Sequence, residues 1–120
     1  MAKLKFNTRD EFIAIDLDYV AAFQADGAYT KAVYITQREY MLNATLSQVD
    51  EALGPYRDAG YKFLSLGRRV IVNHKFLSRI LVTQQLLILS NGGAHDLRVR
   101  IPRQVLRQYK EAVSKSGIQM

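Results

Sequence analysis

Two tight turns flanked by strand-like runs limit the fold of this chain more than any other feature. Asp26-Gly27 and Asn91-Gly92-Gly93 are typical of hairpin turns, because Gly, Asn and Asp accept the positive φ that primed turns require. Short apolar or alternating runs flank each turn, at residues 20–24 and 29–35 and at residues 86–89 and 97–101. The pattern predicts two β-hairpins.

Strand-like runs also fill much of the remaining chain. They lie at residues 11–15, 39–45, 62–66, 70–72 and 79–82. Because most of the chain consists of such runs separated by close turn signals, the predicted fold class is mainly β. In the run at 97–101 apolar residues alternate strictly with Arg98 and Arg100, which places both arginines on the outer face of that strand.

Two helices are predicted between and after these strands. Thr45 and Gln48 have the spacing of a capping box, and Gly54-Pro55 predicts the end of this helix, which gives a helix over about residues 46–53. The second helix begins at Pro102 or Arg103, since proline suits a first helical turn. Its apolar stripe runs to Val113, opposite a basic stripe.

Length and composition indicate one folded domain. A chain of 120 residues with 48% hydrophobic and 23% charged residues can bury a single core, and we expect this core over about residues 6–113 of a domain spanning 1–120. The absence of cysteine excludes disulfides and thiolate chemistry. No signal peptide or bilayer-length apolar run is present, so we expect a cytoplasmic protein that is neither exported nor membrane-spanning.

The charge of the chain is divided between its halves. Residues 1–60 carry 6 Lys+Arg against 9 Asp+Glu, whereas residues 61–120 carry 11 against 2. Seven of these late cations are arginines, whose planar fork binds phosphate or a guanine edge bidentately. A polyanion, and nucleic acid in particular, is the expected partner.

The sequence offers little to an enzyme. Its two histidines, His74 and His95, belong to no metal-binding or catalytic motif, and neither a Gly-rich phosphate loop nor a nucleophile elbow is present. Asn73 before His74 more readily closes a turn than builds a metal site. We therefore expect no enzyme, no cofactor, no metal and no small-molecule substrate.

The cations occupy three separate places in the predicted fold. They are the first hairpin, where Lys31 follows Tyr29 and Thr30, the Gly67-Arg68-Arg69 turn, and the strand-to-helix junction at Arg103. Arginines on a strand or helix face can serve solubility alone. Turns, however, project side chains furthest from a sheet and so suit entry into a groove of nucleic acid.

The order of these motifs resembles the LytTR DNA-binding domains of bacterial transcription regulators. Three segments carry the resemblance and together cover about residues 12–113. YVAAFQADGAYT (19–30) is similar to the family's opening hairpin, I-x-Y-I-E-A-x-x-N-Y-T. The second segment consists of TLSQV (45–49), which is similar to the family's helix, and FLSLGRRVIVN (63–73), which is similar to the F-x-R-x-H-R-S-Y-I-V-N that follows it. The third segment, VRIPR (99–103), is similar to the family's L-x-V-S-R.

The resemblance implies an elongated stack of small antiparallel β-sheets with one helix between sheets and a C-terminal helix. In that family three loops at one edge enter successive major grooves of double-stranded DNA, recognise imperfect direct repeats and bend the duplex. A second copy on the adjacent repeat is then a possible partner. Carried over by position, the DNA contacts fall on Tyr29, Thr30, Lys31, Arg68, Arg69 and Arg103.

Several positions depart from the family pattern. Ala28 occupies a position where the family often has Asn, and Ser65 and Gly67 occupy positions where it has Arg and His. Arg69 and Pro102 each replace a family Ser. The cations are relocated and not lost, so a changed target sequence explains the departures more simply than impaired DNA binding. The receiver or membrane sensor to which the family domain is usually fused has no counterpart in this sequence.

Two alternatives to duplex binding stay open. The basic edge could bind an acidic protein, which would give salt-sensitive binding without preference among DNA sequences. Tyr29, Tyr34 and Tyr40, taken as exposed, could instead stack on the bases of RNA or single-stranded DNA.

Overall fold

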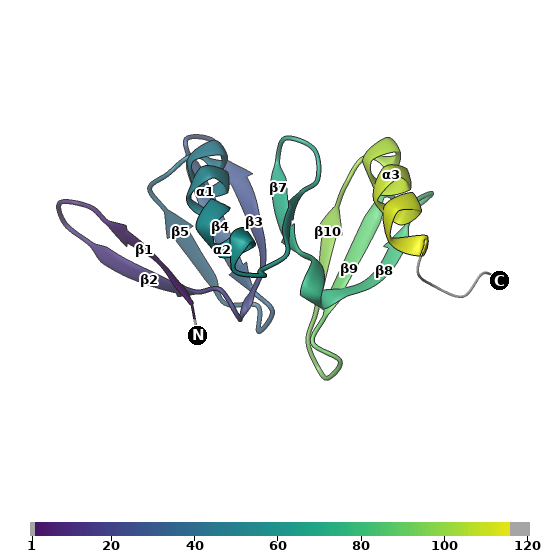
Figure 1. Ribbon diagram of the computed structural model, residues 1–120, viewed down its shortest axis with the longest axis horizontal. Helices are drawn as coiled ribbons and strands as arrows, with labels where there is room; N and C mark the ends of the chain where they lie inside the picture. The colour runs from purple at the N-terminus through teal and green to yellow at the C-terminus, as the bar shows by residue number, and fades with distance from the viewer. Residues whose placement is uncertain (1, 116–120) are drawn as a thin grey trace.

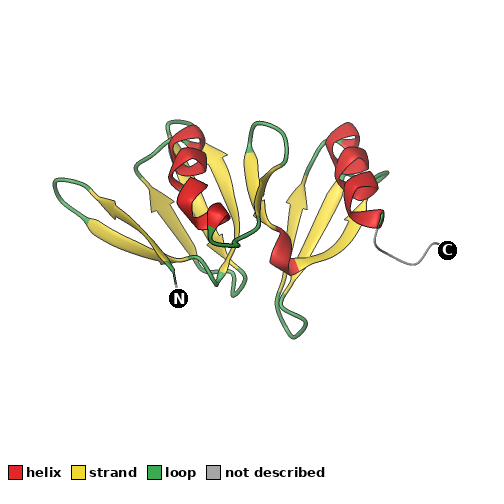
Figure 2. Ribbon diagram, viewed as in Figure 1, coloured by secondary structure: helices red, strands yellow, loops and turns green. Residues whose placement is uncertain are grey.

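Small antiparallel sheets follow one another along an elongated molecule. The computed structural model describes residues 2–115, and its extents are 53 × 29 × 29 Å (Figure 1). Within these residues the strands form a two-stranded sheet β1-β2, a five-stranded sheet β5-β4-β3-β7-β6 and a three-stranded sheet β10-β9-β8. The predicted mainly-β class and stack of small sheets are confirmed (Figure 2).

The first two sheets use the N-terminal half of the chain and β6–β7. Their strands are β1 (Lys3–Asn7), β2 (Phe12–Asp16), β3 (Val20–Asp26), β4 (Tyr29–Tyr34), β5 (Glu39–Leu42), β6 (Phe63–Ser65) and β7 (Val70–Asn73). The third sheet contains β8 (Leu77–Leu81), β9 (Leu86–Ser90) and β10 (Asp96–Arg100). The helical segments are α1 (Leu46–Ala52), α2 (Gly54–Asp58), the 3₁₀ turn η1 (His74–Phe76) and α3 (Arg103–Ser114).

Both predicted hairpins are present. Gly27 adopts φ +61° between β3 and β4, and Gly92 adopts φ +80° between β9 and β10. At each position glycine avoids the steric cost that a side chain would add. The predicted alternation in β10 also holds, since Val99 is buried while Arg98 and Arg100 are exposed.

Strand β1 was not predicted from the sequence. It pairs with β2 in antiparallel register, with Leu4 buried and the flanking lysines exposed. Thr8 closes the intervening turn, because its side-chain hydroxyl accepts from the Glu11 N–H at 3.1 Å. A two-stranded hairpin has little stability alone, and here it depends on packing Leu4 and Ile15 into a core shared with later elements.

Helix α1 has the predicted cap but is followed by an unpredicted second helix. Thr45 Oγ1 accepts from the Gln48 N–H at 3.2 Å, and Gln48 Oε1 accepts from the Thr45 N–H at 2.9 Å, which confirms the capping box. Helix α1 ends before Gly54-Pro55 as predicted, but this pair also begins α2, where Pro55 falls in the first turn and its missing N–H has no role.

Two hydrophobic cores share the five-stranded sheet. On one face Phe23 and Ile71 pack with Val49 of α1 and with the two-stranded sheet, so α1 lies between two sheets as expected. On the other face Ala22 and Val72 pack with the three-stranded sheet and α3. Adjacent residues of one strand therefore serve different cores. No helix within residues 2–115 is both long enough and apolar enough to span a bilayer.

Candidate nucleic-acid interface

Three connections lie along one long edge of the molecule, at the top of Figure 1. They are the β3–β4 turn, the β6–β7 turn and the β10–α3 junction, and we call this surface the loop edge (residues 26–29, 66–69 and 101–103). The Ala25 N–H donates to the Arg69 carbonyl at 2.8 Å, which ties the first connection to the second. The fold thus brings three of the sequence-predicted segments to one surface.

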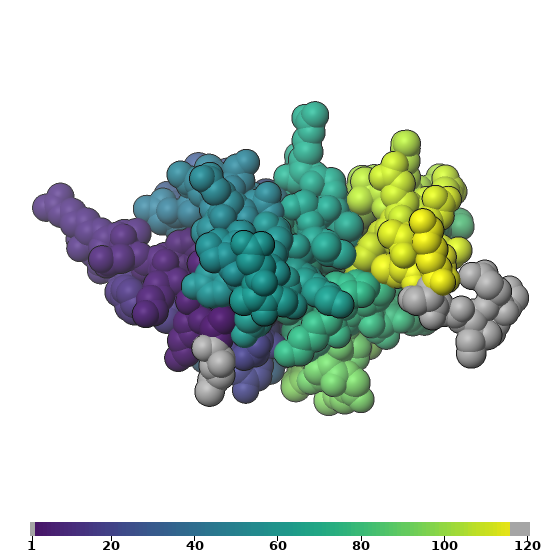
Figure 3. All heavy atoms as spheres, in the orientation of Figure 1, coloured from purple at the N-terminus to yellow at the C-terminus, as the bar shows by residue number. Residues whose placement is uncertain are grey.

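The β6–β7 turn projects furthest from this edge. Leu66 N–H donates to the Val70 carbonyl at 3.0 Å and closes the turn, and Gly67 adopts φ +77° within it. Figure 3 shows the turn as a narrow projection at the top of the molecule. Arg68 and Arg69 are exposed, and among residues 2–115 neither guanidinium has a hydrogen bond or ion pair. Both are available to a ligand.

The β3–β4 hairpin presents only part of its predicted contact set. The Tyr29 side chain is 49% exposed at the tip. Thr30 is fully buried, and its hydroxyl donates to the Ala44 carbonyl at 2.8 Å, so this side chain supports the hairpin from within and does not reach the surface. Lys31 is half-buried, with its Nζ 3.8 Å from Glu39 Oε1.

Arg103 is the first residue of α3 and follows Pro102, which has extended backbone angles. Its side chain is exposed, and Nε donates to the Thr83 carbonyl at 3.4 Å. This contact with the β8–β9 turn orients the guanidinium while its other N–H groups remain free for an acceptor.

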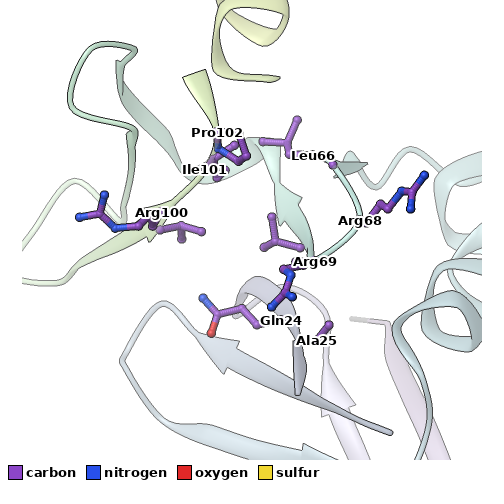
Figure 4. A pocket seen from close by; sticks show the side chains of 11 residues that line it. Gln24, Ala25, Leu66, Arg68, Arg69, Arg100, Ile101 and Pro102 are labelled. Atoms are coloured by element: carbon purple, nitrogen blue, oxygen red, sulfur yellow. The ribbon is translucent and has the colours of Figure 1, made fainter. Parts of the chain in front are cut away.

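A groove of about 470 Å³ separates the β6–β7 turn from the β10–α3 junction. Gln24 and Arg69 lie beside one another in it, whereas Arg68 and Arg100 extend away from each other (Figure 4). Apolar side chains complete the lining: Leu66, Val70, Val99, Ile101 and Pro102.

Two groove residues were not among the predicted contacts. Arg100 faces outward as predicted, and its place beside the loop edge follows from the packing of the third sheet on the second. Gln24 is the one polar residue in the otherwise apolar run at 20–24, which was the available sequence signal. Its amide is a donor and acceptor group suited to a base edge.

The ionisable groups with shifted pKa values lie away from the loop edge. Burial raises the pKa of the Tyr109 phenol to about 12, and its oxygen lies 2.7 Å from His74 Nδ1. A hydrogen bond to the Asp18 carboxylate is the main cause of the raised pKa of Tyr61, and burial is the main cause for Tyr34. These hydrogen bonds join segments that are distant in the sequence and lie outside the loop edge.

Each of the two histidines, His74 and His95, lies beside an asparagine in a turn or loop. Asn73 Oδ1 accepts from the Lys75 N–H at 3.1 Å, which confirms that Asn73 closes a turn. His95 lies beside Asn91, with His95 Nδ1 3.4 Å from Asn91 Nδ2. Within residues 2–115, no three His, Cys, Asp or Glu side chains form a group able to hold a metal ion.

The chain is similar to a known protein in structure, whereas comparisons of its sequence gave no match. No family model matches the chain, and no curated protein matches it. Among solved structures, the chain is similar to a LytTR DNA-binding domain of a methyl-accepting/DNA response regulator from Bacillus cereus. The TM-score is 0.62 with 17% identity, covering 92% of this chain and 95% of that one. The chain has a LytTR-like fold.

The similarity in fold to this LytTR domain extends over nearly all of the chain. The expected architecture is therefore confirmed by a comparison that is independent of the sequence motifs. At 17% identity the likeness is one of fold, and the chemistry of the loop edge must be argued from the residues of this chain.

Proposed function

We propose that this LytTR-like domain binds double-stranded DNA sequence-specifically through its loop edge and regulates transcription in bacteria. The observation that carries the proposal is the projecting β6–β7 turn, whose two exposed arginines have no partner within residues 2–115. A narrow turn with arginines at its tip suits a major groove about 12 Å wide. The similar domain from Bacillus cereus is named as a DNA-binding domain, which supports the same type of partner here.

Affinity and sequence choice come from different residues of the loop edge. Arg68 and Arg103 donate to base edges, because one lies at the tip of a projecting turn and the other is oriented by Thr83. Arg69 supplies charge to the phosphates, assisted by Lys31 of β4 beside the loop edge when Lys31 exchanges Glu39 for a phosphate, and Tyr29 packs against the backbone. Thr30 is omitted from the contact surface because it is buried.

The elongated shape gives a length to the expected binding site. A molecule 53 Å long that lies along a duplex covers roughly 16 base pairs at about 3.4 Å per pair. Several connections along one edge are well placed for neighbouring grooves. In line with the family resemblance, we propose imperfect direct repeats as the target, with a second copy bound beside the first.

The tyrosines favour duplex binding over base stacking on single strands. Tyr34 and Tyr40 are half-buried, contrary to expectation, with their ring centroids 5.0 Å apart. Tyr34 is further held because its hydroxyl accepts from the Asp16 N–H at 2.8 Å. Of these three residues only Tyr29 has a well-exposed ring, and the other well-exposed tyrosine, Tyr19, lies at the opposite end of β3. Within residues 2–115 the exposed tyrosines therefore form no row of stacking platforms.

Selection from a random duplex library at near-physiological salt tests the proposal. We expect a repeated short motif, and on that motif Arg68→Ala or Arg103→Ala should cost about 1–3 kcal/mol with little effect on random duplex. Lys62→Ala is the matched control, because Lys62 lies outside the loop edge. Salt-dependent binding without any enriched motif would refute specific readout.

A further inference from the structure

The outer face of the three-stranded sheet carries cations that the loop edge does not use. Arg79 and Arg98 both lie directly opposite Ile88, from the two sides of β9. Directly opposed residues share one face of a sheet. This face is opposite to the one that packs Leu87, Leu89 and Val99 into the core with α3.

A hollow of about 230 Å³ lies between these two arginines. Leu81 and Leu86, both half-buried, and the buried Ile88 provide the aliphatic part of its floor, and Ser78 and Gln84 add polar groups to its rim. The arginines are exposed, and within residues 2–115 neither makes an ion pair or a side-chain hydrogen bond. Asp96 is the one acidic residue in the lining, and it too forms no ion pair there.

The composition of the hollow indicates the chemistry of its occupant. Two guanidinium groups call for carboxylates or phosphates, whereas an aliphatic floor is stabilised by covering it with apolar surface. A DNA backbone would satisfy the charges and leave the floor without a partner. An acidic protein segment with an apolar side chain between its carboxylates would satisfy both, and arginine is enriched at protein interfaces.

The position of the hollow separates it from the proposed DNA contacts. The loop edge is formed where strands end, whereas this hollow lies on the flat of the sheet, over the middle strand β9. Its Gln84 side adjoins the loop edge, because the carbonyl of the neighbouring Thr83 accepts from Arg103 Nε at 3.4 Å. We expect a duplex along the loop edge to leave Arg79 and Arg98 accessible.

We propose that the outer face of the β8-β9-β10 sheet is a docking surface for an acidic protein segment. Arg79 and Arg98 bind carboxylates on either side of the hollow, and an apolar side chain between them packs on Leu86 and Ile88. This interaction does not depend on the loop edge binding DNA. It gives the domain a protein contact in addition to its proposed nucleic-acid contact.

Peptide selection on the full chain tests the docking surface. A random 12-residue display library is enriched on the wild-type protein at near-physiological salt, and an enriched peptide is synthesised with a fluorescent label. We expect alternating acidic and apolar residues. Affinity should fall roughly tenfold or more in Arg79→Gln/Arg98→Gln and when the peptide's Asp and Glu become Asn and Gln, because charge-assisted bonds are lost.

The controls distinguish this surface from general charge attraction. Arg107→Gln/Lys110→Gln removes the same charge from exposed positions of α3 and should leave peptide affinity unchanged. Leu86→Ser should weaken binding through the floor of the hollow, and a thermal melt of each variant verifies folding. Failure to enrich such peptides, or equal losses in both double variants, would overturn the proposal.

Duplex DNA provides the remaining comparison. If Arg79→Gln/Arg98→Gln instead weakened duplex binding and lowered its salt slope by about 2, the face would belong to the DNA backbone and the docking proposal would be wrong. Unchanged duplex binding together with lost peptide binding is the expected result. Loss of DNA binding in Arg68→Ala would leave the peptide result unaffected.

Discussion

At the scale of single residues, Arg57 joins three elements. From α2 its Nη2 lies 2.6 Å from Asp50 Oδ1, and its Nη1 donates to the Asp50 carbonyl of α1 at 2.9 Å. Its Nε donates to the Phe63 carbonyl of β6 at 2.8 Å. Because β6 leads into the projecting turn, this side chain also anchors the base of the loop edge.

We expect Arg57→Ala to lower the free energy of unfolding by about 2 kcal/mol, since it removes several charge-assisted bonds from a half-buried site. Urea unfolding followed by circular dichroism measures the change. Arg9→Ala is the control, because Arg9 lies outside these contacts and should change stability by less than about 0.5 kcal/mol. Equal effects of the two changes would contradict the anchoring role.

Tyr109 links stability to pH at the same scale. Its phenol is nearly buried, and its pKa is raised to about 12 from an ordinary value of 10.0. The unfolded chain therefore loses this proton at lower pH than the folded chain does. The resulting stability is complete below pH 10.0 and is lost as the pH rises toward about 12.

Comparison of wild type with Tyr109→Phe isolates this effect from the other tyrosines. Near pH 9 we expect the variant to be less stable by about 1 kcal/mol, because the hydrogen bond to His74 is lost. By about pH 11.5 the wild type should lose roughly 2 kcal/mol relative to the variant, which reverses their order. Urea unfolding across this range measures the difference, and a constant difference would contradict the raised pKa.

At the scale of elements, the β6–β7 turn depends on a glycine. Gly67 has φ +77°, and an added Cβ would lie 3.8 Å from Val105 Cγ2, an ordinary contact distance. Substitution therefore meets backbone strain and no clash. We expect Gly67→Ala to cost about 1 kcal/mol of stability and to weaken binding to the selected DNA motif, because Arg68 follows directly.

Gly54→Ala is the matched control for this turn. Gly54 has no left-handed φ, begins a helix, and has open space where a Cβ would be added. The change should be neutral or stabilise the protein by up to about 1 kcal/mol, with DNA binding unchanged. Thermal unfolding and duplex titration of the two variants should diverge, and parallel behaviour would show that φ at Gly67 is unimportant.

At the scale of the whole molecule, the two cores are joined through β3 and β7. These strands contribute side chains to both cores, so loss of either core removes packing from the sheet on which the other core also depends. We therefore expect one cooperative unfolding transition, although the molecule is elongated.

Cavity-forming changes in separate cores test this coupling. Leu42 belongs to one core and Leu89 to the other, and both are fully buried. Leu42→Ala and Leu89→Ala should each cost about 2–5 kcal/mol and shift the same single transition. Circular dichroism and tyrosine fluorescence should give coincident curves in both variants, whereas separate transitions would show that the cores unfold independently.

The sequence by itself determined the local structure of this protein. The hairpin at Gly27, the cap at Thr45 and the alternation around Arg98 depend on backbone sterics and on neighbours a few residues away. The family resemblance read from those motifs also led to the correct architecture. Strand β1 and helix α2 were missed because a weak β pattern and a Gly-Pro pair are resolved only by packing.

Only the tertiary structure decided which polar side chains are available. Thr30 follows the exposed Tyr29 but faces inward, and Tyr34 and Tyr40 pack on each other. Conversely, Gln24 and Arg100 are far apart in the sequence yet line one groove. Exposure and convergence arise from sheets packing on sheets, so they depend on contacts between distant segments that no local sequence pattern contains.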